Sequence, residues 1–131
     1  MAGWGTGSFE NEDAQKFLGL LHAKNPEDLR SILARAADEE DYLDAPASGV
    51  VIAAAEVVAT ALGRPPHSVP LEIAEWVRRV EGAPSVEMAD LARRAVDRVR
   101  TRSELKDLWL EAEGLNEWST ALRELGERLR G

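Results

Sequence analysis

Apolar residues are concentrated in one stretch of the chain, residues 50–62, which reads VVIAAAEVVATAL. Pro46, Ser48 and Gly49 precede this stretch and Gly63 follows it, and such residues are typical of the start and the end of a helix. A helix that is apolar on nearly every side belongs inside a bundle of helices. The stretch therefore predicts a central, Ala/Val-rich helix around which the rest of the chain packs.

On both sides of this stretch, apolar residues recur three and four positions apart, which is typical of amphipathic helices. The helices predicted in this way cover residues 11–22, 25–36, 71–81, 85–100, 101–112 and 115–129. Candidate N-caps precede several of them, including a capping box that Thr101 and Glu104 would form. No stretch shows the sustained alternation of a half-buried strand. We therefore predict an all-α fold, a compact bundle of about seven helices in residues 11–131.

The first ten residues do not fit a helix, because glycine occupies three alternate positions from Gly3 onward. Glycines allow a backbone to lie close against another surface, and Trp4 and Phe9 supply two aromatic anchors. These glycines are not a phosphate-binding loop, since no strand precedes them and no Gly-Lys-Ser/Thr follows. We predict that residues 1–10 form an N-terminal arm docked on the bundle, within one domain of residues 1–131.

The formal net charge is −8, and the acidic excess lies mostly in the first third of the chain. Residues 1–44 contain ten acidic and four basic residues, a net charge of −6. Because an acidic chain repels phosphate backbones, we expect no nucleic-acid partner. The run at residues 38–44 lacks the ligand spacing of a calcium loop, so it predicts a solvated connector with Tyr42 turned inward.

Arginines between residues 93 and 102 form the one basic concentration in the chain. Their spacing spreads them over the outer face of a predicted helix. Such a face could bind phosphate or a carboxylate-rich partner. We favour the interpretation that it pairs with the acidic N-terminal half of its own chain or of a second copy.

The chain contains no cysteine, which excludes disulfide bonds, thiol catalysis and thiolate metal sites and fits a reducing compartment. Its first residues lack the basic and apolar regions of a secretion signal. The central apolar stretch is shorter than the roughly 20 residues that span a bilayer. We therefore expect a soluble, cytoplasmic protein without membrane contacts.

Residues with catalytic or metal-binding chemistry are few and scattered. The two histidines, His22 and His67, lie in different segments, and neither has a partner at the helical spacing of a metal site. No serine lies in the sequence of a nucleophile elbow. We predict no catalytic residue, no metal and no cofactor.

Glu56 is the most informative polar residue, because it interrupts the central apolar stretch. It shares one helical stripe of small or polar residues with Gly49, Ala53, Thr60 and Gly63. This stripe either faces solvent or a close-packed backbone, or Glu56 is buried and accepts hydrogen bonds from backbone N–H groups of the arm or from an indole. A buried carboxylate needs such partners, because an unpaired one costs several kcal/mol or takes up a proton. Of the roles open to Glu56, we favour a structural clasp.

Three segments stand out in order along the chain: WGTGSFENEDA at residues 4–14, DYLDAP at residues 41–46 followed by AAAEVVA at residues 53–59, and SELKDLW at residues 103–109. Together they resemble the bacterial domain-of-unknown-function family 4259 over almost the whole chain. The resemblance implies no activity, cofactor or catalytic residue. It groups the arm, the acidic connector and the central carboxylate as one candidate cluster, formed by Trp4, Phe9, Asn11, Tyr42 and Glu56.

These observations favour a non-enzymatic bacterial protein of the cytoplasm that acts through protein–protein contacts or self-association. Its acidic N-terminal face and its four tryptophans motivate this hypothesis, since two tryptophans clustered at the surface would mark a partner site. One alternative is an acidic antagonist, of the immunity type, that neutralises a basic partner with the help of electrostatic steering. Another is a small-ligand binding protein or enzyme that uses Glu56 beside the arm.

Overall fold

The computed structural model describes residues 7–38, 43–80 and 82–130. These residues form seven α-helices and one short 3-10 helix: α1 Glu12–Leu20, η1 Leu21–Ala23, α2 Pro26–Asp38, α3 Ala45–Ala61, α4 Leu71–Arg79, α5 Val86–Thr101, α6 Glu104–Glu111 and α7 Leu115–Arg130. Within the described residues there is no strand, only an isolated bridge between Leu43 and Ser103. The predicted all-α fold is therefore confirmed.

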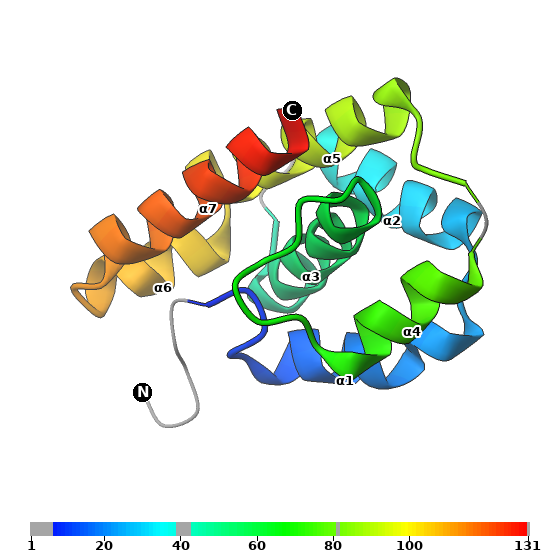
Figure 1. Ribbon diagram of the computed structural model, residues 1–131. Helices are drawn as coiled ribbons and strands as arrows, with labels where there is room; N and C mark the ends of the chain where they lie inside the picture. The colour runs from blue at the N-terminus through cyan, green and yellow to red at the C-terminus, as the bar shows by residue number, and fades with distance from the viewer. Residues whose placement is uncertain (1–6, 39–42, 81, 131) are drawn as a thin grey trace.

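Helix α3 is the centre of the bundle, as its sequence predicts. It contacts each of the six other α-helices, which surround it in Figure 1. Twelve consecutive residues, 48–59, contain eleven that are buried, among them a run of alanines and valines that lets the neighbouring helices approach closely. Because α3 is buried on all sides, its stability comes mainly from tertiary packing and less from the intrinsic helix propensity of its residues.

The start of α3 differs from the prediction. The helix begins at Ala45, where the Asp44 side chain accepts a hydrogen bond from the Ala47 N–H at 2.8 Å and acts as the N-cap. Pro46 therefore lies in the first turn, where its missing N–H has no helical partner to lose. The predicted end is confirmed, because Gly63 adopts a φ of 85° just after the helix.

The capping box predicted at Thr101 is wrong. Helix α5 continues to Thr101, and Ser103 caps α6 instead by accepting a hydrogen bond from the Lys106 N–H at 3.1 Å. Glu104 turns outward from this cap and accepts a hydrogen bond from the Ala45 N–H at 2.7 Å. The start of α3 is thereby tied to the start of α6.

Helices α5 and α7 lie side by side and run in opposite directions, joined by the short α6 (Figure 1). Buried residues of these two helices supply much of the core, among them Leu91, Val96, Leu122 and Leu125. At the other side of α3, α1 and α4 pack near one another. Among the described helices, none combines the length and the apolar composition that crossing a membrane requires.

Candidate functional site

Glu56 is buried in the middle of α3, with 2% of its surface exposed. Both of its carboxylate oxygens accept hydrogen bonds. The Arg128 guanidinium donates to Oε1 through Nη1 at 2.7 Å and to Oε2 through Nη2 at 3.2 Å. The Ser8 hydroxyl donates to Oε2 at 2.6 Å. Glu56 thus joins the N-terminal segment, the central helix and the last helix of the chain.

All three nitrogens of the Arg128 guanidinium donate hydrogen bonds. Its Nε donates to Glu124 one turn earlier in α7 at 2.6 Å, and its own carbonyl accepts a hydrogen bond from Arg64 at 3.1 Å. Burial alone would lower the pKa of Arg128, but the hydrogen bonds to Glu56 and Glu124 outweigh burial and raise it. The guanidinium therefore stays charged, as a fork-shaped partner of a buried carboxylate must.

The segment that precedes α1 lies along the stripe of small residues on α3. Asn11 is the N-cap of α1, since its side chain accepts a hydrogen bond from the Ala14 N–H at 2.8 Å. Its Oδ1 lies so close to α3 that a Cβ added at Gly49 would be 2.7 Å away. Phe9 is half-buried against the core, and its carbonyl accepts a hydrogen bond from Gln15. Gly49 thus provides the space for the cap of α1.

The alternative that Glu56 faces solvent is wrong, because the hydroxyl and the guanidinium cover it. Among described residues, the donors to Glu56 are the side chains of Ser8 and Arg128. The predicted donors, backbone N–H groups of the arm or an indole, fall mainly on residues 1–6, which the structure does not describe. Trp4 and Tyr42, the other members of the predicted cluster, lie outside the described residues.

Ser8 and Arg128 are the two residues of this site that the sequence did not reveal. Ser8 is one polar residue among several in the arm. Arg128 stands next to Leu129, at the edge of the apolar seam of α7, where arginine stems commonly cover apolar surface. The sequence offered only a general indication of such a partner, namely that a buried carboxylate requires a cation near the core.

The arrangement around Glu56 is that of a buried, hydrogen-bonded ion pair. A carboxylate held by a two-pronged guanidinium and a hydroxyl has its proton-accepting oxygens engaged within the protein. In residues 7–38, 43–80 and 82–130, no three acidic or histidine side chains come together as a metal site would need.

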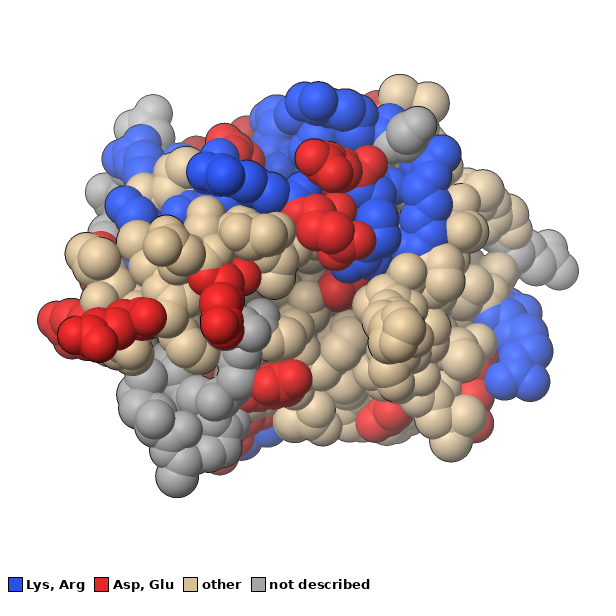
Figure 2. Space-filling view, turned by 60° about the vertical axis from the view of Figure 1, so that its left-hand side comes forward, with Lys and Arg blue, Asp and Glu red and all other residues tan. Residues whose placement is uncertain are grey.

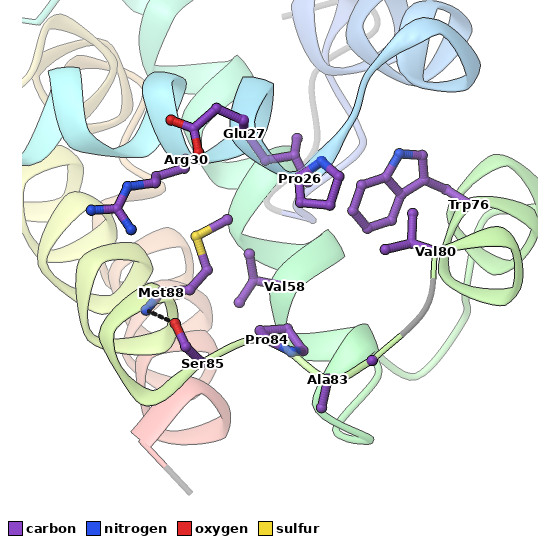
Figure 3. A pocket seen from close by; sticks show the side chains of 12 residues that line it. Pro26, Glu27, Arg30, Val58, Trp76, Val80, Ala83, Pro84, Ser85 and Met88 are labelled. Carbon is purple, nitrogen blue, oxygen red and sulfur yellow. Dashed lines mark hydrogen bonds between the residues drawn. The ribbon is translucent and has the colours of Figure 1, made fainter.

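An apolar pocket of about 260 Å³ opens between α2, α4 and the start of α5. Figure 3 shows Trp76 and Val80 on one side, Met88 on the other, and Val58 of α3 between them. The Trp76 indole N–H points out of the pocket and donates to the carbonyl of Lys24 at 2.9 Å. The described tryptophans are core residues or partly buried, so they form no exposed aromatic patch of the kind that would mark a partner site.

A second cavity, of about 210 Å³, lies between α5 and α7. Four arginines line it, two from each helix: Arg93, Arg100, Arg123 and Arg130. An adjoining cavity of about 490 Å³ shares Arg93 and Arg130, so the two cavities form one groove along the helix pair. In Figure 2, lysine and arginine side chains gather in the upper part of the molecule, at the height of α5 and α7 in Figure 1.

Arginines 93–102 were predicted to pair with the acidic N-terminal half of this chain or of a second copy, and two of them pair within their own helix instead. Arg93 pairs with Asp90, and Arg100 pairs with Asp97, both three residues away in the same helix. Neighbours at this spacing lie on the same helical face and form the pair without any tertiary contact. Arg94 does reach the acidic half, where its guanidinium lies 3.9 Å from the Asp38 carboxylate.

The profile of the family described as Domain of unknown function (DUF4259) matches residues 3–121. The chain belongs to this family. The match includes Ser8, Asn11 and Glu56 and ends before Arg128. No curated protein and no solved structure matches the chain. The function of this DUF4259 protein is therefore inferred from the geometry of its own residues.

Proposed function

We propose that this chain is a non-enzymatic protein of the bacterial cytoplasm that acts by binding another protein. The observation that carries the proposal is the segregation of charge. On a chain with a net charge of −8, four arginines and two acids line one groove between α5 and α7, which gives this groove a net charge of +2. Clustered charges of one sign steer an oppositely charged partner and fix its orientation. This face therefore supports contact with a partner that presents carboxylates.

The state of Glu56 supports a binding role over a catalytic one. A general base has to come within hydrogen-bond distance of a substrate proton. Glu56 is 2% exposed, and the groups around it already donate to both of its oxygens. The enzymatic alternative required Glu56 to reach a ligand, and this burial argues against that role.

The acidic-antagonist alternative draws on the run at residues 38–44, of which residues 39–42 lie outside the described part of the chain. The two described acids of this run are engaged within the domain. Asp38 lies 3.9 Å from Arg94, and Asp44 caps α3. The groove between α5 and α7 is lined by four arginines, all described, so we place the contact there.

The test is affinity capture of the full chain from the cells that express it, at low and at high salt. A charge-reversed variant, Arg123→Glu with Arg130→Glu, is compared with a control that changes the net charge equally, Arg35→Glu with Arg78→Glu. We expect a partner that the wild type and the control retain at low salt and that high salt or the groove variant releases. A chain that retains no protein at either salt concentration would contradict the proposal.

A further inference from the structure

Gly126 lies inside α7, where a glycine weakens a helix relative to alanine. Internal packing does not require it. A Cβ built on Gly126 would meet no atom within 4 Å, and the residue does not have a positive φ. Gly49, by contrast, has a neighbour 2.7 Å from its added Cβ. Gly126 instead lines the groove between α5 and α7, which is deeper there because glycine has no side chain.

The groove repeats itself along its length. Arg93 and Arg100 are seven residues apart on α5, and Arg123 and Arg130 are seven residues apart on α7. Seven residues of α-helix advance by about 10.5 Å and return to nearly the same face. On each helix the two arginines therefore lie two turns apart and on the same face. One pair flanks each side of the groove, and Val96, Leu122 and Gly126 lie between the pairs.

We infer that this groove docks an acidic α-helix of the partner, with its small apolar face against Gly126 and its carboxylates against the arginines on both sides. The inference rests on the proposed function and names the contact it uses. A docked helix with glutamates seven residues apart repeats its charges at the same interval as the arginines. A helix can approach another closely where a glycine removes the side chain between them.

The charges of the groove determine the sign of its partner. Four arginines and two acids, Asp97 and Glu127, line the cavity, which leaves a net charge of +2. Arg93 and Arg100 each have an acid of α5 beside them, whereas Arg123 and Arg130 form no ion pair with another described residue. These two arginines of α7 are the ones available to a partner's carboxylates.

A polypeptide suits this groove better than a nucleic acid does. The residues that line the cavity include no aromatic side chain on which a base could stack. The two acids inside the groove would repel a continuous phosphate backbone, whereas a helix can place its carboxylates between them. The rest of the surface carries the excess negative charge of the chain, which also repels a polyanion.

The first experiment uses a labelled peptide and fluorescence anisotropy. The peptide is an alanine-rich helix of about 18 residues with two pairs of glutamates, each pair seven residues apart, on the two flanks of an alanine stripe. A control peptide has the same composition with its glutamates moved to the opposite face. We expect saturable, salt-sensitive binding of the first peptide, and Arg123→Glu with Arg130→Glu should weaken it at least about tenfold. Arg35→Glu with Arg78→Glu should leave it unchanged.

The second experiment separates close helix packing from simple charge attraction. Gly126→Ala adds one methyl group to the floor of the groove and changes no charge. Because alanine favours helices and this Cβ meets nothing inside the domain, the variant should melt at a higher temperature than the wild type. The same methyl group should weaken peptide binding about tenfold by overpacking the contact. Gly19→Ala, in the open surface of α1, is the matched control and should not change binding.

Several outcomes would overturn the inference. Equal binding of both peptides, equal binding by the Gly126→Ala variant, or stronger binding of a single-stranded oligonucleotide than of the peptide would each do so. The acidic peptide could fail to bind while the groove variant still loses a protein that the wild type captures. That result would reject the acidic helix as the ligand but keep the proposed function, because a partner would then bind the groove in another form. If the groove variant captures the same protein as the wild type, both the proposed function and the acidic-helix inference are rejected.

Discussion

Replacing Arg128 by methionine tests whether the Glu56–Arg128 pair holds the fold together. The substitution keeps a long side chain at the edge of the α7 seam but removes the guanidinium. Glu56 is then left inside α3 with the Ser8 hydroxyl as its remaining described partner. A buried carboxylate without a counter-charge has lost most of its hydration without an equivalent gain, so the folded state becomes less favourable.

The expected magnitude follows from the burial of the two side chains, which are 3% exposed for Glu56 and 16% exposed for Arg128. Breaking a buried pair by removing one partner costs about 3–5 kcal/mol. We expect the lower end, about 3 kcal/mol, because the exposed part of the Arg128 site admits water. Domains of this kind are stable by about 5–15 kcal/mol, so the loss is a large part of the total.

The assay is urea unfolding at neutral pH, followed by circular dichroism, for Arg128→Met, for Glu56→Gln and for the double variant. The raised pKa of Arg128 means that its contribution is complete below the unfolded-state pKa and is lost only as the pH rises through the folded pKa. Neutral pH therefore measures the full effect. The double variant should lose less than the two single variants together, because neither charge is left alone. A loss below about 1 kcal/mol for Arg128→Met would refute the reasoning, since exposed pairs contribute that little.

Three other predictions concern the arm, the close approach at Gly49 and one surface carboxylate. Gly49→Ala should lower the free energy of unfolding by about 1–3 kcal/mol, because its Cβ would lie 2.7 Å from the Asn11 cap; adding Asn11→Gly should recover part of this loss in the same urea assay. Ser8→Ala should cost about 1 kcal/mol and speed amide exchange in residues 7–11, while unchanged exchange would show that the hydroxyl does not hold this segment. The hydrogen bond from Arg93 lowers the pKa of Asp90, so the ion pairs of Asp90 stabilise the fold above its unfolded-state pKa and are lost as the pH falls through its folded-state pKa. Carboxyl NMR should find a lower titration midpoint for Asp90 in the wild type than in Arg93→Gln, and equal midpoints would contradict this.

The architecture was open to prediction because hydrophobic periodicity encodes it locally. Residues 50–62 are apolar on all sides, and a helix of that composition has to be surrounded whatever the order of its neighbours. The boundaries were less certain where two caps compete. Asp44 displaced the expected start near Gly49, and Ser103 displaced Thr101, because the cap is chosen by which side chain meets the free N–H groups of the folded chain.

The site was predictable only in part, because its partners come from distant segments. Glu56 signals itself, since it interrupts an apolar helix. Arg128 is 72 residues away and does not differ in pattern from other arginines at a helix surface. The groove between α5 and α7 was hidden for the same reason. Its arginines are ordinary in each helix, and they become a shared feature only when the two helices pack in opposite directions.

The clasp on Glu56 has a consequence for the order in which the protein can complete its fold during synthesis. At the usual rate of translation, the ribosome makes Arg128 roughly 4–14 seconds after Glu56, since 72 residues separate them. Throughout that interval the most apolar helix of the nascent chain carries a carboxylate whose counter-ion does not yet exist. The early helices are therefore made before the buried carboxylate has its counter-charge, and the Glu56–Arg128 pair can form only once the last turn of α7 has been synthesised.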